Sequence, residues 1–375
     1  MKKILILLAF VLLLTGCAAD TPEPENTTVT TTVPAPAEPE PVVVVTDEVK
    51  AQFDEILKRN QFEGIAYLTH NGEVVYQSVS GTSDMGNPLT IDSPMYVCSI
   101  SKQFCAAAIL MLRDQGKLSL DDTLEKYFPD YTIGKDITLH NLLSMRSGLI
   151  RDYTPVIDNP EQYADWTAEE INAHMIRWIF EQPLQFEPDK KFEYSNVNYI
   201  LLSYIVEQIS GESYEDFIRQ NIFAPLGMEH SGFLSQVENH PEWELTYDAL
   251  LEGSAQGDQC QGCGDIVTTA GDIDIWMTAL RSGHVVSEES YQEMTTDYNL
   301  GRGYGYGLTV GVRGGWMHGG TNGAYTSMAY FNKEYGYNFY IVTPSTPQFR
   351  PNQTQDITVD LLSKLYAAVD AAEKV

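Results

Sequence analysis

One stretch organises the whole sequence: Tyr96-Val97-Cys98-Ser99-Ile100-Ser101-Lys102-Gln103-Phe104. Residues 101–115 are apolar on most faces and are followed by Gly116, which predicts a buried helix through the centre of the protein. Ser99 lies at the start of this helix, and Lys102 shares its face because residues three apart on a helix are neighbours. A serine becomes an effective nucleophile when an adjacent base takes its proton, and a lysine is able to do so.

The Ser-x-x-Lys pattern by itself is weak. The chain holds 22 Ser and 13 Lys in 375 residues, so about one match is expected by chance. One match, Ser99 with Lys102, is what the chain contains. A catalytic interpretation therefore needs partner residues elsewhere in the sequence.

Strand patterns occur near both ends of the chain, and helix patterns fill the middle. Strands at 64–70 and 73–79 flank Asn71-Gly72, which is typical of a tight hairpin turn. Further strands are expected at 306–312, 326–332 and 337–342, and helices at 47–60, 197–209, 214–222 and 354–369. We therefore predict an α+β fold with two lobes. Both chain ends build an antiparallel sheet flanked by helices, the centre forms a mostly helical lobe, and Ser99 lies near the junction.

The first 46 residues are expected to be targeting and tether segments. Lys2 and Lys3 precede eleven apolar residues, and Leu14-Thr15-Gly16-Cys17 resembles a bacterial lipoprotein processing site. Residues 1–16 are then a signal peptide and Cys17 is the lipidated residue; an ordinary secretory signal is the alternative. Residues 17–46, rich in Pro, Thr and Glu, are predicted to form a disordered tether. The folded domain at 47–375 is thus predicted to be exported and lipid-anchored to the bacterial cell membrane, on its outer side.

Composition excludes one class of partner. The chain has 23 Lys and Arg against 52 Asp and Glu, a net charge of −29, whereas nucleic-acid binding requires basic surfaces. We therefore expect no nucleic-acid partner.

Four cysteines follow Cys17: Cys98, Cys105, Cys260 and Cys263. The segment Cys260-Gln261-Gly262-Cys263 would need two more ligands to hold zinc, and the sequence offers no second Cys-x-x-Cys or His pair. In an exported protein this pair forms a local disulfide or stays as free thiols, and both alternatives remain open.

Two motifs further along the chain supply partners for Ser99. They are Tyr194-Ser195-Asn196, just before the helix expected at 197–209, and His318-Gly319-Gly320-Thr321, between strand patterns. Ser-x-x-Lys, Tyr-x-Asn and His-x-Gly in this order resemble the serine β-lactamase-like hydrolases. These include class C β-lactamases, D-alanyl-D-alanine carboxypeptidases, and their esterase and D-aminopeptidase relatives. The resemblance covers residues from about 50 to 345, and it includes segments 106–122, 137–149, 225–228 and 266–273.

The resemblance implies a β-lactamase/transpeptidase-like fold and catalysis through an acyl-enzyme on Ser99. Lys102 and Tyr194 would share the Ser99 proton; both are protonated at neutral pH at their ordinary pKa values, so which one is the base stays open. Asn196 would orient Lys102 and the substrate amide. The backbone N–H groups of Ser99 and Thr321 would hold the oxyanion. No metal or organic cofactor enters this scheme.

The segment after the last motif departs from the family pattern. Relatives that recognise penicillin carry lysine or histidine followed by a hydroxyl residue, whereas this chain has His318-Gly319-Gly320. A histidine is mostly neutral at pH 7 and Gly319 has no hydroxyl, so weaker binding of a substrate carboxylate is expected. A second Tyr-x-Asn, Tyr330 to Asn332, lies inside a strand pattern, where core packing explains it. Cys98, Met145 and Arg146 have no role that the sequence indicates.

These observations lead to one main hypothesis. The protein is a cell-envelope serine hydrolase that acts through a Ser99 acyl-enzyme on peptidoglycan-type D-amino-acid peptides or small esters and amides. A penicillin- or peptidoglycan-binding sensor lipoprotein without turnover, a weak β-lactamase and a scaffold that packs against a partner are the alternatives. The oligomeric state is not indicated by the sequence.

Overall fold

The computed structural model describes residues 45–153, 155, 160–163, 165–245, 260–299, 301, 303–322, 325–344 and 353–373. The expected signal peptide, the lipidated Cys17 and the tether up to residue 44 lie outside the described residues. Val45 is buried in the core and the Thr46 hydroxyl caps the first helix, so these two residues of the predicted tether belong to the folded part. Within the described ranges, no helix combines the length and apolar character that crossing a bilayer requires.

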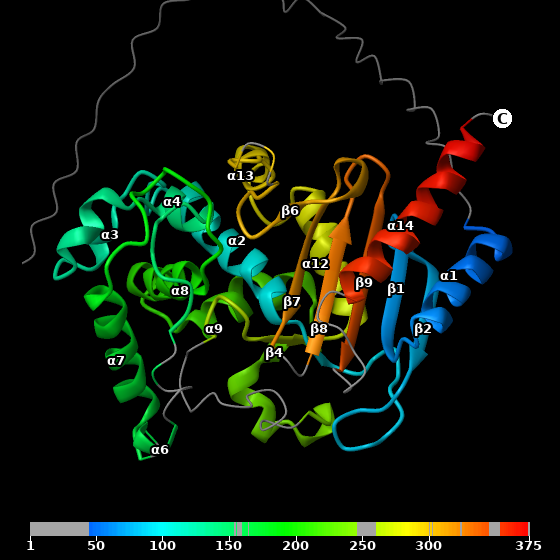
Figure 1. Cartoon of the computed structure of the whole chain (residues 1–375), viewed down its shortest axis with the longest axis horizontal. Coiled ribbons are helices and arrows are strands. Elements are labelled where there is room, and N and C mark those ends of the chain that lie inside the picture. The colour runs from blue at the N-terminus through cyan, green and yellow to red at the C-terminus, as the bar shows by residue number, and fades with distance from the viewer. Residues whose placement is uncertain are drawn as a thin grey trace, which may run out of the picture. The chain divides into compact units, whose positions relative to one another are not determined.

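Strands from both ends of the chain form the main sheet (Figure 1). Its six strands run in the order β2-β1-β9-β8-β7-β6. Their bounds are β1 Gly64–His70, β2 Glu73–Ser80, β6 Thr309–Val310, β7 Trp316–Thr321, β8 Tyr325–Phe331 and β9 Tyr337–Pro344. All the pairings are antiparallel, and the pairing of β1 with β9 joins the two ends of the chain. The predicted sheet is confirmed.

One predicted strand is mostly wrong. Of the expected strand at 306–312, only Thr309–Val310 pairs as β6. Gly307 has a φ of 67°, and a Cβ there would lie 2.6 Å from the Lys102 carbonyl oxygen. This left-handed residue interrupts the extended chain and lets it pack against the start of the central helix.

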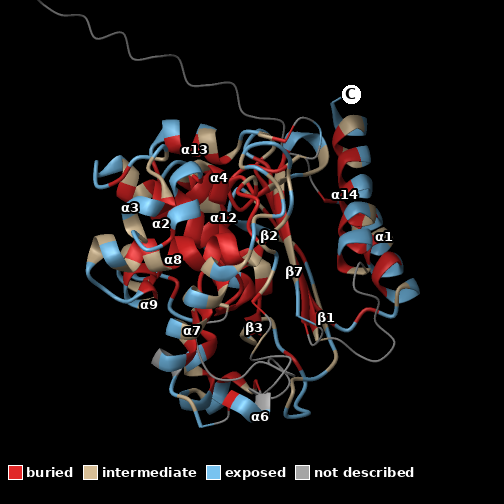
Figure 2. Ribbon diagram, turned by 60° about the vertical axis from the view of Figure 1, so that its left-hand side comes forward, coloured by how far each residue is buried: buried red, intermediate tan, exposed pale blue. Residues whose placement is uncertain are grey.

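Helices cover both faces of the main sheet (Figures 1 and 2). On one face, α1 (Asp47–Arg59) lies beside α14 (Gln353–Ala372), as predicted. Their buried residues, among them Phe53, Ile56, Leu361 and Leu365, form one apolar cluster with inward-facing residues of the sheet. On the other face, α12 (Ala270–Arg281) packs against β9, β8 and β1 and belongs to a larger core that extends into the helical lobe.

The helical lobe is built around α2 (Ser101–Asp114) and α8 (Asn196–Ser210), which pack against each other. Nearly all of α2 is buried, which confirms the predicted central helix. The remaining helices are α3 Leu124–Tyr127, α4 Leu139–Leu143, α6 Pro160–Tyr163, α7 Ala168–Glu181, α9 Tyr214–Ile218, α10 Ala224–Leu226 and α13 Glu288–Met294. Shorter helical turns are η1 Cys98–Ile100, η2 Thr132–Asp136, η3 Arg219–Phe223, η4 Leu234–Asn239, η5 Pro241–Trp243 and η6 Val312–Gly314.

A small second sheet fixes the position of the chain segment that leads into α2. Its strands, in the order β3-β5-β4, are β3 Met95–Tyr96, β5 Ile266–Thr268 and β4 Gly232–Phe233. Because β3 ends directly before η1, the β3–β5 pairing sets where Ser99 lies. The Val97 N–H continues the pairing with a hydrogen bond of 3.1 Å to the Ile266 carbonyl.

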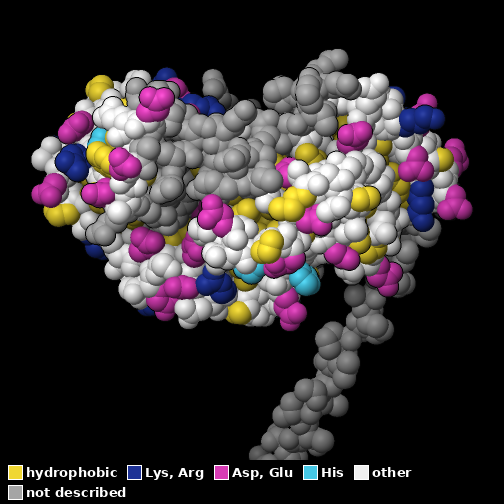
Figure 3. Space-filling model, turned by 90° about the horizontal axis from the view of Figure 1, so that it is seen from below, with side chains coloured by type: hydrophobic (Ala, Val, Ile, Leu, Met, Phe, Trp, Pro, Cys, Tyr) yellow, Lys and Arg dark blue, Asp and Glu magenta, His cyan; other side chains and the backbone are white. Residues whose placement is uncertain are grey.

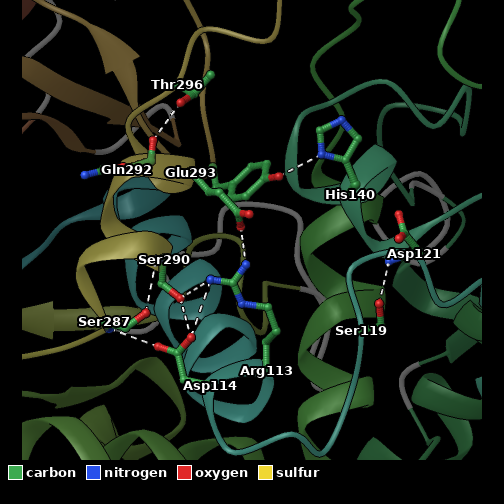
Figure 4. Close-up of polar contacts among 11 residues, drawn as sticks. Arg113, Asp114, Ser119, Asp121, His140, Ser287, Ser290, Gln292, Glu293 and Thr296 are labelled. Carbon is green, nitrogen blue, oxygen red and sulfur yellow. Dashed lines mark hydrogen bonds and ion pairs between the residues drawn. The ribbon is translucent and has the colours of Figure 1, made fainter.

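The far end of α2 is held to α13 by a polar network (Figure 4). Arg113 donates to Glu293 and Ser290, while the Asp114 carboxylate accepts from the Ser290 hydroxyl at 2.6 Å and the Ser287 N–H at 2.9 Å. Partial burial opposes ionisation of Asp114, but these hydrogen bonds outweigh burial and hold the pKa of Asp114 below its usual range. The ionised carboxylate therefore stabilises the fold.

Asp114→Asn should lower the free energy of unfolding at neutral pH by about 1–3 kcal/mol, because hydrogen bonds to a charged acceptor are lost. A carboxyl whose folded pKa is depressed adds stability above its unfolded pKa, and this contribution disappears as the pH falls through the folded pKa. The difference in free energy of unfolding between wild type and Asp114→Asn should therefore become smaller as the pH falls. Urea titrations at several pH values measure this effect, with the exposed Asp130→Asn as control. A deficit that is the same at all pH values would contradict the argument.

Candidate active site

Ser99 and Lys102 lie side by side, as the helical spacing predicts. Ser99 sits in the single turn η1 that enters α2, and Lys102 is buried on the first turn of that helix. The Lys102 Nζ donates to the Ser99 Oγ at 3.1 Å and to the Cys263 carbonyl oxygen at 2.5 Å. The lysine is thus fixed against the serine by a second, buried hydrogen bond.

The Lys102 ammonium is surrounded by groups that favour its charge. Its Nζ lies 5.0 Å from the ring centre of Tyr194 and 5.8 Å from that of Tyr199. Burial works against the ammonium, but the Tyr194 hydroxyl, which also shares a hydrogen bond with it, and the thiols of Cys263 and Cys260 outweigh burial. The pKa of Lys102 therefore lies above its usual range, and Lys102 carries its proton at neutral pH.

The nucleophile is presented by a strained backbone. Cys98, directly before Ser99, has a φ of 51°, which is uncommon for a residue with a side chain. Its thiol is buried and lies 3.8 Å from the Tyr325 carbonyl oxygen. Such a conformation costs about 1–3 kcal/mol and persists only where surrounding structure imposes it. The position of Cys98 gives it the role that the sequence does not indicate: it turns Ser99 toward the cavity.

Strand β7 packs directly on this turn at Gly320. A Cβ at Gly320 would lie 2.5 Å from the Cys98 Cβ, 2.6 Å from the Ser99 nitrogen and 2.7 Å from the Val97 oxygen. Only a glycine permits this approach. Strand β6 pairs with Trp316 and Met317 alone, so the predicted His318-Gly319-Gly320-Thr321 element lines a cavity instead of pairing with β6.

The cavity has a volume of about 480 Å³ and collects most of the predicted site. Its lining includes every predicted site residue of the folded part except Lys102, which lies buried behind Ser99: Ser99, Tyr194, Asn196, His318, Gly319, Gly320 and Thr321. A larger cavity of about 750 Å³ is lined by Arg219, His230, His240 and Trp243, among others, and contains none of these residues. The chemistry therefore belongs to the smaller cavity.

The structure corrects the prediction for Asn196. This residue begins α8, and its Nδ2 donates to the Asp152 carboxylate at 2.7 Å. The Asn196 Oδ1 is buried and has no hydrogen-bond partner among the described residues. Lys102 instead donates to Ser99 and Cys263, so Asn196 does not orient the lysine. Its open acceptor remains suited to the second predicted role, which is to receive an N–H from a substrate amide.

His318 is buried and neutral. Its Nδ1 lies 2.7 Å from the Gly319 carbonyl oxygen, which only accepts, so Nδ1 carries the proton and Nε2 faces the Tyr304 hydroxyl at 3.4 Å. Burial, together with the nearby Lys102 charge, lowers the pKa of His318 to about 3. The histidine therefore offers a substrate carboxylate no positive charge at neutral pH.

This depressed pKa has a consequence for stability. A histidine that is neutral in the folded state and titrates at its ordinary pKa when unfolded adds stability above pH 6.5, and that stability is lost as the pH falls toward the folded pKa. Between about pH 6 and pH 4, wild type should lose about 1.4 kcal/mol per pH unit more than His318→Gln. Chemical unfolding at several pH values across this range measures the slope of the free energy of unfolding against pH. Equal slopes would show that His318 is protonated in the folded protein.

Two residues that line the cavity, Tyr304 and Arg151, belong to none of the motifs found in the sequence. Tyr304 is buried and lies edge-on to both Tyr194 and His318, with ring centres 6.2 and 5.9 Å apart. The Arg151 guanidinium lies 5.4 Å from the Tyr194 ring centre at the cavity wall. Both come from segments far from the motifs in sequence, and only the Gly-Tyr repeats near Tyr304 could have drawn attention to it.

The remaining sequence features are structural. Met145 has a φ of 60°, and its sulfur lies 3.3 Å from the Ser195 nitrogen, while Arg146 binds Asp189 and the Tyr298 carbonyl. Together they position the loop that carries Tyr194. The second Tyr-x-Asn packs between β8 and the C-terminal helix, where the Tyr330 hydroxyl lies 2.6 Å from that of Tyr366, as expected for a core residue.

The sequence leaves the state of the cysteines open. No disulfide joins Cys98, Cys105, Cys260 and Cys263 in the described part of the chain, so the thiol alternative is the one observed. Across the described ranges, no group of three or more His, Cys, Asp or Glu side chains is arranged to hold a metal ion. The face shown in Figure 3 carries scattered acidic side chains and no large basic patch, in line with the net charge of −29.

Comparisons with known proteins agree with this site. The family model described as Beta-lactamase matches residues 49–362. The chain is 32% identical over 279 residues to the protein named penicillin-binding protein PbpX of Bacillus subtilis (strain 168), covering 71% of this chain and 67% of that protein. It is 26% identical over 272 residues to D-aminopeptidase of Brucella anthropi, covering 70% of this chain and only 51% of that protein.

A solved structure shows the same fold. The D-amino acid amidase from Ochrobactrum anthropi SV3 matches with a TM-score of 0.70 at 23% identity, covering 87% of this chain and 99% of that one. The family model spans most of the sequence, and the structure gathers Ser99, Lys102 and Tyr194 at one cavity. The chain therefore belongs to the beta-lactamase family and is a serine hydrolase of that family.

Proposed function

We propose that this protein is a cell-envelope hydrolase that acylates Ser99 with neutral D-amino-acid amides, related peptides or small esters. One observation carries the proposal: Lys102 lies between the Ser99 hydroxyl, at 3.1 Å, and the Tyr194 ring, beside a cavity with no cationic group at His318. A nucleophile, two adjacent groups that can move its proton, and a neutral histidine at the predicted carboxylate-binding position are the parts that such a reaction requires.

The proton moves through Tyr194 in this proposal. Because Lys102 already holds its proton, it cannot take another from Ser99, whereas the Tyr194 hydroxyl, which shares a hydrogen bond with Lys102, is the neighbouring group that can pass the proton on. The Ser99 Oγ attacks the substrate carbonyl carbon, and its proton passes to Tyr194 and then to the leaving amine or alcohol. The backbone N–H groups of Ser99 and Thr321 bind the oxyanion. Water, activated by the same pair, then cleaves the acyl-enzyme.

The binding wall favours an amide over a carboxylate. The Asn196 Oδ1, which has no hydrogen-bond partner in the part of the chain that the structure describes, accepts a hydrogen bond and cannot donate one, so it suits a substrate N–H. His318 is neutral, and the Arg151 guanidinium is already paired with Asp152 at 3.0 Å. The relative named D-aminopeptidase supports a D-amino-acid substrate. We propose amide or ester hydrolysis ahead of carboxypeptidase or β-lactamase activity.

A substrate panel tests this proposal. The kcat/KM values for D-alanine amide, L-alanine amide, a D-alanyl-D-alanine peptide and a p-nitrophenyl ester are compared, with Ser99→Ala as the control. We expect turnover of the ester and a preference for D- over L-alanine amide, with the free-carboxylate peptide slower. A preference for the D-alanyl-D-alanine peptide would instead identify a carboxypeptidase. A stable fluorescent-penicillin adduct without any turnover would identify a sensor.

The location outside the cell is part of the proposal. It rests on the sequence at Cys17, which resembles a lipoprotein processing site, and on the Pro- and Thr-rich segment that follows it. Metabolic labelling with an alkyne fatty acid should mark the wild-type protein in membranes, and Cys17→Ala should abolish the label. Label that persists in the variant would remove the lipid anchor from the proposal.

A further inference from the structure

The thiols of the folded part gather around the catalytic turn. Cys98 precedes Ser99, Cys105 follows Lys102 by three residues in α2, and Cys263 accepts a hydrogen bond from Lys102 through its carbonyl oxygen. Cys260 and Cys263 also share a side-chain hydrogen bond with each other. None of these thiols takes part in the proposed hydrolysis, so their concentration at the site needs another explanation.

The backbone already holds Cys260 and Cys263 at disulfide distance. The Cys263 N–H donates to the Cys260 carbonyl at 2.9 Å, and the Gly264 N–H donates to the same oxygen at 2.8 Å. A turn closed by such a bond brings its first and fourth Cα atoms within about 7 Å. Disulfides require Cα atoms about 4.4–6.8 Å apart. The pair can therefore be oxidised with little movement of the backbone.

The turn is fixed tightly in the core. Gly262 has a φ of 68°, and a Cβ there would lie 2.8 Å from the Ser203 Cβ and 2.9 Å from the Tyr199 oxygen. The Gly262 N–H donates to Asp265 at 3.0 Å, and the Tyr96 hydroxyl donates to the Gly264 carbonyl. The same turn carries the Cys263 carbonyl, which accepts the 2.5 Å hydrogen bond from Lys102, so a change at the two sulfurs reaches the lysine.

The two thiols differ in pKa and in exposure, as thiol–disulfide exchange requires. The hydrogen bond from Cys263, aided by the Lys102 charge, overcomes burial and lowers the pKa of Cys260, whereas the same hydrogen bond and burial raise the pKa of Cys263. Cys260 is also partly exposed, while Cys263 is buried. Reactive cysteines lie in such electropositive, partly exposed surroundings. Burial raises the pKa of Cys98 and of Cys105, which suits inert thiols.

We propose that Cys260 and Cys263 form a reversible dithiol–disulfide site whose oxidation state sets the reactivity of Ser99. The Cys260 thiolate attacks one sulfur of a small-molecule disulfide, whose other sulfur leaves as a thiolate. The Cys263 thiol loses its proton to solvent and attacks the Cys260 sulfur, which expels the second thiolate. One disulfide bond breaks in the reagent and one forms in the protein, so the pair gives up two electrons and two protons.

Oxidation should speed acylation, and this part rests on the proposed function. In the reduced protein, the Cys263 carbonyl holds the Lys102 Nζ at 2.5 Å, and ionisation of Cys260, whose pKa the hydrogen bond from Cys263 and the Lys102 charge lower, adds an anion beside this lysine. A disulfide carries no ionisable proton, so oxidation removes this anion. The Lys102 charge then acts on Tyr194 and Ser99 alone. We expect the oxidised protein to react several-fold faster with a fluorophosphonate probe than the reduced protein.

The experiment uses the purified protein in two redox states. One sample is treated with oxidised glutathione and the other with dithiothreitol, and both are desalted before intact-mass analysis, peptide mapping and timed fluorophosphonate labelling. The oxidised wild type should lose two hydrogens and show a Cys260–Cys263 cross-link, and so should Cys105→Ala. Cys260→Ser and Cys263→Ser should show no such cross-link and equal labelling rates in both states.

Three results would each overturn one part of the proposal. A wild type that stays reduced in oxidised glutathione, or that links Cys105 instead, overturns the redox site without reference to any variant. A Cys260–Cys263 cross-link with unchanged labelling overturns its coupling to Ser99. A cross-link in a protein whose Ser99 is labelled in neither state contradicts the proposed function and leaves the disulfide site established.

Discussion

Replacing Lys102 with methionine is expected to lower the rate of Ser99 acylation by about 10²–10⁴-fold, because proton transfer through Tyr194, a step that supplies a factor of this size, depends on the neighbouring Lys102. Methionine fills a similar volume but removes the charge that lies beside Tyr194 and the hydrogen bond to the Ser99 Oγ. Without the ammonium, the Tyr194 hydroxyl loses the group with which it shares a hydrogen bond. Stopped-flow or timed labelling with a fluorophosphonate, together with ester turnover, measures the loss.

A matched control distinguishes the loss of Lys102 from the loss of any other lysine side chain. Lys126→Met removes an exposed lysine that pairs with Asp122 at 2.7 Å, far from Ser99 in the helical lobe. It should acylate at the wild-type rate. Thermal unfolding of both variants reports whether the Lys102 variant is folded. A folded Lys102→Met protein that acylates within a few-fold of wild type would remove Lys102 from the mechanism.

Gly320→Ala is expected to reduce acylation by about 100-fold and to lower stability by about 1–3 kcal/mol. The new methyl group would lie within 2.7 Å of Cys98, the Ser99 nitrogen and the Val97 oxygen. Two of these contacts are with backbone atoms, which cannot rotate away. Strand β7 must therefore move from η1, which separates the oxyanion donors of Ser99 and Thr321 by a shift large enough to slow the reaction.

The neighbouring glycine provides the control. A Cβ at Gly319 would meet the Cε of Met328 at 2.6 Å, and that atom is the end of a flexible side chain. Gly319→Ala should thus be folded and active within a few-fold of wild type. Labelling rates and urea unfolding of the two variants are compared side by side. Equal effects at both positions would show that the close packing of β7 on Ser99 has no catalytic importance.

The local parts of this site follow from sequence periodicity. Ser99 and Lys102 are three residues apart on one helix, so their contact depends only on helical geometry, which the apolar pattern of 101–115 predicts. The same holds for the hairpin at Asn71-Gly72 and for α8, whose apolar residues begin at Val197. The placement of Tyr194 and His318 at the same cavity was predicted from the family resemblance and not from spacing.

The parts that sequence could not predict depend on contacts between distant segments. Asp152 lies 44 residues before Asn196 and takes its amide, which diverts Asn196 from Lys102. The Cys263 carbonyl lies 161 residues after Lys102 and fixes its ammonium. Gly320 was predicted only as part of the substrate-binding and oxyanion element, whereas the structure shows that it makes room for Ser99. No periodic pattern encodes such pairings, because they are set by how the lobes pack.

Covalent labelling determines whether Ser99 is the nucleophile. The purified protein is incubated with a fluorophosphonate, and the adduct is located by intact mass and peptide mapping, with Ser99→Ala in parallel. We predict one adduct on the wild type, on the peptide that contains Ser99, and none on the variant. An adduct of equal yield on Ser99→Ala, or one mapped to another residue of the wild type, would contradict the account.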